Sequence, residues 1–258
     1  KEIFLSTRLI GAEFAEGTSI YEIPEKFKPA IASEILRVES ENLFKELQDS
    51  DDKIIFDPDR HPGNIRVSIA DNGLVKIAHI DFGQTQTITK RQRDQVFEVF
   101  ALSQILAKTG ATDWAVAYLE KVFGLASSGS NSASKSTSKK IKAALSAYFP
   151  EENLREVKAY YSVLSALLEA GVPLDIVLFD FVKGIIQMTQ YEEFMDQKSE
   201  VTPTKRFEAE VRKRADRLVS EMKLTNVEKI KIGILRKNES TTKATNVHSL
   251  APRCANLF

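Results

Sequence analysis

The segment Ile54–Gly83, IIFDPDRHPGNIRVSIADNGLVKIAHIDFG, decides the fold of this chain, because it joins two strand patterns to closely spaced polar residues. Apolar and polar residues alternate from Asn64 to Ala70, and a second strand pattern runs from Leu74 to Ile80. Between the two patterns, residues 71–73 read Asp-Asn-Gly, and these residue types accept positive φ in tight turns. The segment therefore predicts a β-hairpin that follows a polar loop.

Most of the remaining chain has apolar residues at helical spacing. The predicted helices are 24–47, 91–108, 114–123, 139–148, 151–169, a segment that resumes after Pro173 and ends near Gln190, and an amphipathic helix after Pro203 whose other face is basic. Short strands are also expected at Ile3–Leu5 and Ile54–Phe56. The expected fold class is α+β but mostly α, with one small hairpin.

The composition excludes several classes of function. The chain has 258 residues, and its 36 Lys and Arg balance its 36 Asp and Glu, so no basic excess is available to neutralise nucleic-acid phosphates. Cys254 is the single cysteine, which rules out an internal disulfide and a zinc site built on several thiolates. The most apolar stretch, Val172–Met188, is interrupted by two Asp and one Lys, which argues against a membrane-spanning helix.

Three polar residues of the deciding segment have the spacing of a phosphoryl-transfer site. Such a site needs a divalent metal that bridges phosphate oxygens and a carboxylate near the attacking group, and Mg²⁺ prefers oxygen ligands. Kinases supply them from an Asp-x4-Asn loop, a hairpin and Asp-Phe-Gly. Asp59 and Asn64 have the loop spacing, and Asp81 begins Asp-Phe-Gly. Each residue alone also suits a turn or a cap, but their order predicts that the three side chains converge.

The sequence resembles a known family at these residues. His61-Pro62-Gly63-Asn64-Ile65 and Ile80-Asp81-Phe82-Gly83-Gln84 are similar to the two signatures of the UbiB-like atypical kinases. Residues 6–8, Ser-Thr-Arg, and residues 13–17, Glu-Phe-Ala-Glu-Gly, are similar to the hinge between the lobes of that family. The family is associated with coenzyme Q biosynthesis and with mitochondrial or plastid lipid metabolism.

This resemblance implies a protein-kinase-like C-lobe that binds ATP and Mg²⁺ and acts as an ATPase or an unorthodox kinase. By position, Asp59 would be the catalytic carboxylate, while Asn64 and Asp81 would hold the metal and, with Gly83, the cofactor. The expected partners are a nucleotide and an isoprenoid lipid or membrane surface, in a mitochondrion or plastid. The Ala-rich nucleotide loop and the Lys-x-Gly-Gln motif of the family are expected upstream of Lys1.

The resemblance also divides the chain into four parts. Residues 1–21 would be a remnant of the hinge, with the N-lobe largely absent, and residues 22–195 the C-lobe. A low-complexity Ser-rich stretch within it, residues 126–138, is predicted to be a mobile loop. Residues 196–235 form the amphipathic-helix region, and residues 236–258 a polar tail.

One departure leaves the identity of the loop acid open. The family reads Asp-Pro-His-Pro-Gly-Asn, whereas here Asp57-Pro58 precedes Asp59-Arg60. Either Arg60 replaces the proline and Asp59 is the acid, or two residues are inserted and Asp57 is; the preserved x4 spacing favours Asp59. His61 is expected to shape the loop, and His79 to be buried in the strand and hydrogen-bonded rather than catalytic.

Two other functions remain open at this stage. One is a small-molecule phosphotransferase of the aminoglycoside or choline kinase type, although that class has His two residues before the loop Asp, where this chain has Asp57. The other is a kinase-like scaffold without turnover. Little chain separates Asp81 from the next buried helix, which favours a lipid-like or small-molecule substrate, or ATP hydrolysis, over a peptide.

Overall fold

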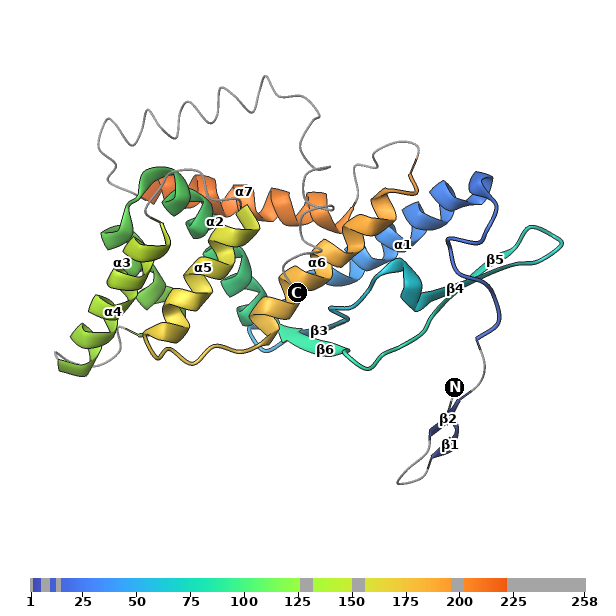
Figure 1. The fold of residues 1–258 in the computed structure, drawn as a ribbon, viewed down its shortest axis with the longest axis horizontal. Coiled ribbons are helices and arrows are strands. Elements are labelled where there is room, and N and C mark those ends of the chain that lie inside the picture. Colours follow the sequence, from blue (N-terminus) through green and yellow to red (C-terminus); the bar gives the residue numbers. More distant parts are fainter. Residues whose placement is uncertain are drawn as a thin grey trace, which may run out of the picture.

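The described part of the protein is mostly helical (Figure 1). A computed structural model describes residues 2–5, 10–12, 15–125, 132–149, 156–195 and 202–221, with the backbone alone for 2–5, 10–12 and 132–135. The α-helices are α1 (Lys28–Leu43), α2 (Lys90–Thr109), α3 (Thr112–Phe123), α4 (Ser132–Tyr148), α5 (Glu156–Glu169), α6 (Val177–Glu192) and α7 (Pro203–Glu221). The strands are β1 (Glu2–Leu5), β2 (Ile10–Ala12), β3 (Lys53–Phe56), β4 (Ile65–Ile69), β5 (Val75–His79) and β6 (Gln86–Thr89). Short 3-10 turns at Glu25–Phe27 and Pro62–Asn64 precede α1 and β4.

Helix α2 is the centre of the core and packs against α3, α5, α6 and α7. It is apolar on several faces, and Phe97 and Phe100 are buried between the rings of neighbouring helices. Its start is fixed by a capping box, in which Thr89 Oγ1 accepts from Gln92 N and Gln92 Oε1 accepts from Thr89 N. Only six residues therefore separate Gly83 from the central helix.

The predicted hairpin is present. Strands β4 and β5 pair antiparallel, with Ile65 opposite His79 and Ile69 opposite Val75. Gly73 in the turn has φ of 80°. Thr18 and Val67 exchange two backbone hydrogen bonds of 2.9 and 2.8 Å, so the chain before α1 is held against β4.

The expectation of one hairpin is corrected, because the described residues contain three two-stranded sheets. Strand β3 was expected, but its antiparallel partner β6 was not. Strand β6 has four residues, of which Ile88 alone is fully buried, so its pattern is too short to distinguish from a loop. The pairing of β1 with β2 was also missed, since β2 is three residues long.

The prediction of a mobile loop at residues 126–138 is wrong for residues 132–138. Helix α4 begins at Ser132, so residues 132–138 are helical, while residues 126–131 lie outside the described residues. Ile141 and Leu145 are fully buried and anchor α4 in the core. Once a helix is anchored, each added residue gains a backbone hydrogen bond, and the Ser138 hydroxyl donates to Glu120 on α3. The polar tail, residues 236–258, lies outside the described residues.

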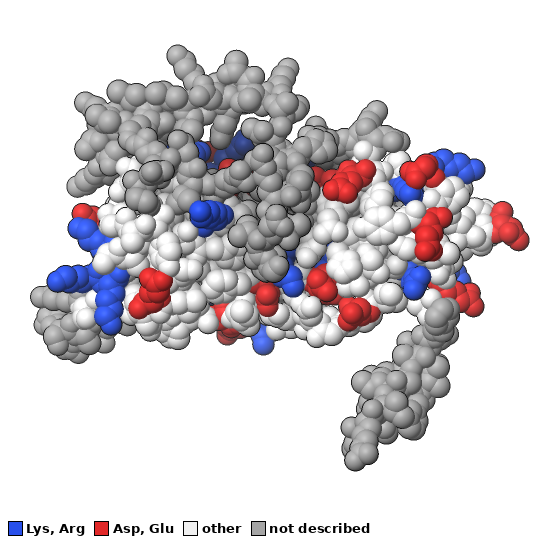
Figure 2. Space-filling model, viewed as in Figure 1, with Lys and Arg blue, Asp and Glu red and all other residues white. Residues whose placement is uncertain are grey.

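The basic helix predicted after Pro203 is α7, and two of its arginines bind α2. Arg214 pairs with Asp94 and Glu98, and Arg217 pairs with Glu98. Part of its basic face therefore attaches the helix to the core. Elsewhere both signs of charge are spread over the face in Figure 2. Within the described residues, each helix is too short or too polar to cross a bilayer.

Candidate functional site

Two connections between the same pair of sheets lie side by side and carry the predicted site residues (Figure 1). The Asp59 loop, residues 57–64, joins β3 to β4, and the Asp81 segment, residues 80–85, joins β5 to β6. Phe56 pairs with Gln86 and Ile65 with His79, so the two connections begin and end at neighbouring points. The Ile80 N–H donates to the Asn64 carbonyl at 2.9 Å and joins them directly.

The side chain of Asn64 fixes the shape of the Asp59 loop. Its Nδ2 donates to the Asp59 carbonyl at 2.9 Å, and the residue is 9% exposed. This bond uses the amide nitrogen, and no described donor binds Oδ1. An amide oxygen held in this way is a suitable ligand for Mg²⁺.

Asp57 and Asp59 have different environments. Asp57 is 1% exposed, and its Oδ1 accepts the Asp59 N–H at 2.9 Å, which makes it a turn-forming residue. The Asp59 side chain is 28% exposed and reaches Gln84, which follows Asp-Phe-Gly, at 3.5 Å from Nε2 to Oδ2. Asp59 thus contacts the Asp81 segment through its side chain.

Asp81 sits on an unusual backbone turn at the start of its segment. Its φ is 59°, a left-handed conformation that Asp and Asn adopt more readily than most residues. Its Oδ1 accepts the Gly83 N–H at 3.1 Å, and both residues are exposed. A Cβ at position 83 would lie 3.2 Å from the same Oδ1, so a side chain there would crowd the carboxylate.

The structure brings the predicted residues together through Asn64. It bonds to Asp59 on one side and to Ile80, the neighbour of Asp81, on the other. Within the described ranges, no group of three His, Cys, Asp or Glu side chains is arranged to hold a metal. A metal here would therefore take two carboxylates at most, the amide oxygen and water, which is a set that suits Mg²⁺.

A buried cluster of charged side chains joins the Asp59 loop to α1. Arg60 Nε lies 3.2 Å from Glu39 Oε1 on α1, and the Arg60 guanidinium lies 5.8 Å from the centre of the Phe82 ring. Burial raises the pKa of Glu39, while Arg60 lowers it. His79 Nε2 is 3.9 Å from the same Glu39 oxygen, and burial, together with the charge of Arg60, lowers the pKa of His79 from 6.5 to about 4.

Of the histidine predictions, that for His61 is confirmed, since its Nδ1 accepts the Gly63 N–H at 3.0 Å. His79 is partly buried as expected, but its Nδ1 has no hydrogen-bond partner among the described residues. Sequence reasoning missed Glu39, although it continues the buried stripe of Ile31 and Ile35 at four-residue spacing. An acid on an apolar stripe was the available signal.

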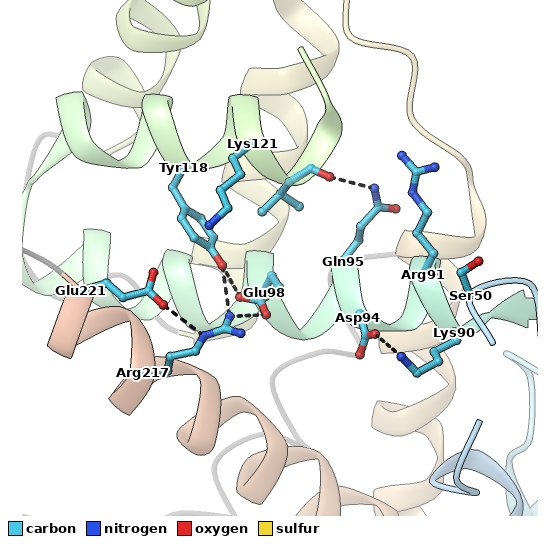
Figure 3. A pocket seen from close by; sticks show the side chains of 11 residues that line it. Ser50, Lys90, Arg91, Asp94, Gln95, Glu98, Tyr118, Lys121, Arg217 and Glu221 are labelled. Atoms are coloured by element: carbon cyan, nitrogen blue, oxygen red, sulfur yellow. Dashed lines mark hydrogen bonds and ion pairs between the residues drawn. The ribbon is translucent and has the colours of Figure 1, made fainter. Parts of the chain in front are cut away.

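A hollow of about 420 Å³ lies elsewhere, between α2, α3 and α7 (Figure 3). It is lined by Ser50, Lys90, Arg91, Asp94, Gln95, Glu98, Tyr118, Lys121, Val122, Arg217 and Glu221. Figure 3 shows Arg217 bonded to Glu98 and Glu221, and Lys90 to Asp94, so much of its charge is internally paired. None of the predicted site residues lines this hollow.

Two adjoining loops that present Asp59, Asn64 and Asp81 around a short hairpin indicate a kinase-like class of domain. The sequence model of the ABC1 atypical kinase-like domain matches residues 3–109. The matched range contains both connections, α1 and the whole of α2, while α3–α7 follow it. No curated protein matches the chain. No solved structure matches it either.

Proposed function

We propose that this protein is a UbiB-like member of the ABC1 atypical kinases, that residues 22–195 form its C-lobe, and that it uses Mg-ATP for phosphoryl transfer or ATP hydrolysis. One observation carries the proposal: Asn64 binds the Asp59 carbonyl through its side chain and Ile80 through its backbone. The loop acid, the amide and the start of Asp-Phe-Gly are thereby held in one place, and positioning is a large part of catalysis in this reaction class.

The three residues take different roles in this proposal. Asp81, exposed at the head of its segment, binds the main Mg²⁺, and Asn64 Oδ1 contributes to a second metal position. Asp59 accepts the proton of the attacking hydroxyl or water. We assign this role to Asp59 and not to Asp57, because the Asp57 carboxylate is buried and its Oδ1 already accepts the Asp59 N–H.

The short connection after Asp81 supports a small or lipid-like acceptor. Of the six residues between Gly83 and α2, four form β6 and are paired with β3. No long segment remains there to hold an extended peptide. The family resemblance favours an isoprenoid lipid of the coenzyme Q type as this acceptor. It also favours a location in a mitochondrion or plastid.

Release of ADP by the full-length gene product tests this function. With Mg-ATP, and with or without detergent-solubilised isoprenoid lipid, we expect Asp59→Asn to lower turnover by about 100-fold, since general bases contribute 10²–10⁴. Binding of Mg-ATP should persist. The control is Asp71→Asn, an exposed position in the turn of the same hairpin. Undiminished turnover in Asp59→Asn would refute the assigned role, and absence of turnover in the unmodified protein would favour a scaffold.

A further inference from the structure

Lys183 of α6 lies beside the proposed catalytic acid, although it is 124 residues away in sequence (183 − 59). Its Nζ is 4.0 Å from Asp59 Oδ1 and donates to Gln84 Oε1 at 3.2 Å. Gln84 Nε2 in turn points to Asp59 Oδ2 at 3.5 Å. The three side chains form a ring in which an ammonium group faces the carboxylate across a space wider than a direct hydrogen bond.

Helix α6 is built to bring this lysine to the site. Asp180, Lys183 and Gly184 occupy one face of the helix at i, i+3 and i+4. Asp180 Oδ2 accepts from Gln86 Nε2 at 2.5 Å, which attaches this face to β6. A Cβ at Gly184 would lie 3.3 Å from the Asp57 carbonyl oxygen and from Pro58 Cα, so the helix approaches the Asp59 loop closely because this residue is glycine.

Lys183 supplies a permanent cation beside Asp59, whereas His61 of the loop, with Nε2 3.9 Å from Asp59 Oδ2, is charged only when protonated. The only Lys or Arg within the Asp59 loop is Arg60, and its guanidinium is buried against Glu39 with its side chain 10% exposed. The Lys183 side chain is 22% exposed, so its ammonium group is accessible to a ligand. Transfer of a phosphoryl group requires fixed positive groups where negative charge is spread over its oxygens.

We propose that Lys183 is a catalytic residue that binds the transferring phosphoryl group beside Asp59. This inference rests on the proposed function. The attacking oxygen forms a bond to the γ-phosphorus, and the bond to the bridging oxygen breaks with its electron pair leaving on ADP. The attacking hydroxyl gives its proton to Asp59, and Lys183 donates a hydrogen bond to a phosphoryl oxygen throughout. Gln84 holds the ammonium group in place until the phosphate enters.

Lys183 lies outside the range matched by the kinase-like domain, residues 3–109. The placement of Lys183 beside Asp59 therefore comes from the packing of α6, which the matched range does not include. It also predicts that α6 is required for activity and not for stability alone.

The test compares Lys183→Met and Lys183→Arg with Lys142→Met in the full-length protein. Lys142 pairs with Asp113 at the surface of α4 and controls for the same chemical change. We expect Lys183→Met to lower turnover by about 100-fold, as removal of one transition-state hydrogen bond does elsewhere, with affinity for Mg-ATP within about 3-fold of the unmodified protein. Lys183→Arg should recover most of the loss, and Lys142→Met should have no effect.

A second, equilibrium measurement separates this inference from the proposed function. Mg-ADP with aluminium fluoride mimics the planar phosphoryl group, and it should bind the unmodified protein more tightly than Mg-ADP alone. Lys183→Met should lose that difference while still binding Mg-ADP. Equal tightening in Lys183→Met would overturn the role of Lys183. Absence of tightening in the unmodified protein would instead overturn phosphoryl transfer itself, and Lys183 with it.

Discussion

Arg60 Nε lies 3.2 Å from Glu39 Oε1, and both side chains are at most 10% exposed. This pair joins the Asp59 loop to α1, and Arg60 also faces the Phe82 ring of the Asp81 segment. One buried cation of the Asp59 loop thus contacts both α1 and the residue after Asp81. Arg60 therefore has a structural role in this chain.

Replacing Arg60 by Met should destabilise the protein by about 3 kcal/mol at pH 7, because it leaves the Glu39 carboxylate buried without its partner. Urea denaturation measures the free energy of unfolding. Arg37→Met is the control, since Arg37, on the same helix as Glu39, pairs with Glu34 and Glu41 at the surface and should cost much less stability. Equal losses of unfolding free energy in the two variants would show that the buried pair stabilises the protein no more than the exposed one.

The pH dependence of Arg60→Met gives a second check of the same pair. The pKa of Glu39 is raised by burial and lowered by Arg60, so loss of Arg60 raises it further. When the pKa of a group is higher in the folded than in the unfolded state, the free energy of unfolding falls as the pH rises through the folded pKa. The deficit of Arg60→Met should therefore shrink as the pH falls toward 4.5, where Glu39 can take up a proton.

His79 should weaken the fold on acidification. Its pKa is about 4 in the folded protein and 6.5 unfolded, so the unfolded chain binds the proton more readily between these values. Its contribution is complete above pH 6.5 and is lost as the pH falls toward 4. Between pH 7 and pH 5 we expect the free energy of unfolding to fall by about 1 to 2 kcal/mol, a figure that already allows for the partial exposure of His79. His79→Gln should remove this part of the pH dependence in urea titrations, and an unchanged profile would contradict it.

The contribution of the capping box at the start of α2 to stability should be measurable with a single substitution. Thr89→Ala removes the hydroxyl that accepts from Gln92 N, which we expect to cost about 1 kcal/mol of unfolding free energy. Thr87→Ala in the same strand is exposed and should cost less. If both substitutions had the same effect, the cap would not fix the start of the central helix.

The sequence predicted the elements whose patterns are long and regular. The hairpin β4–β5, central helix α2 and the position of Asn64 in its loop follow from alternation, helical spacing and the Asp-x4-Asn count. Strand β6 was missed because four residues with one buried Ile88 carry too weak a pattern.

Long-range packing explains what the sequence could not show at the site. Lys183 meets Asp59 only because Gly184 lets α6 approach the loop, and this contact spans residues with no shared local pattern. Gln84 was noted only as the last residue of a signature, yet it links the lysine to the acid. Helix α4 begins earlier than composition suggests, since two buried residues farther along anchor it.

Calorimetric titration of Mg-ATP into the full-length protein and its Asp81→Asn variant tests the central claim most directly. Asparagine also tolerates the left-handed backbone at position 81, and its amide oxygen can still accept the Gly83 N–H. The variant thus removes the charge that offsets the metal and leaves the turn intact. We predict Mg²⁺-dependent binding to the unmodified protein and loss of at least about 100-fold in affinity in Asp81→Asn, about 2.7 kcal/mol. Equal affinities in the two proteins would contradict the account, because Asp81 would then not hold the metal.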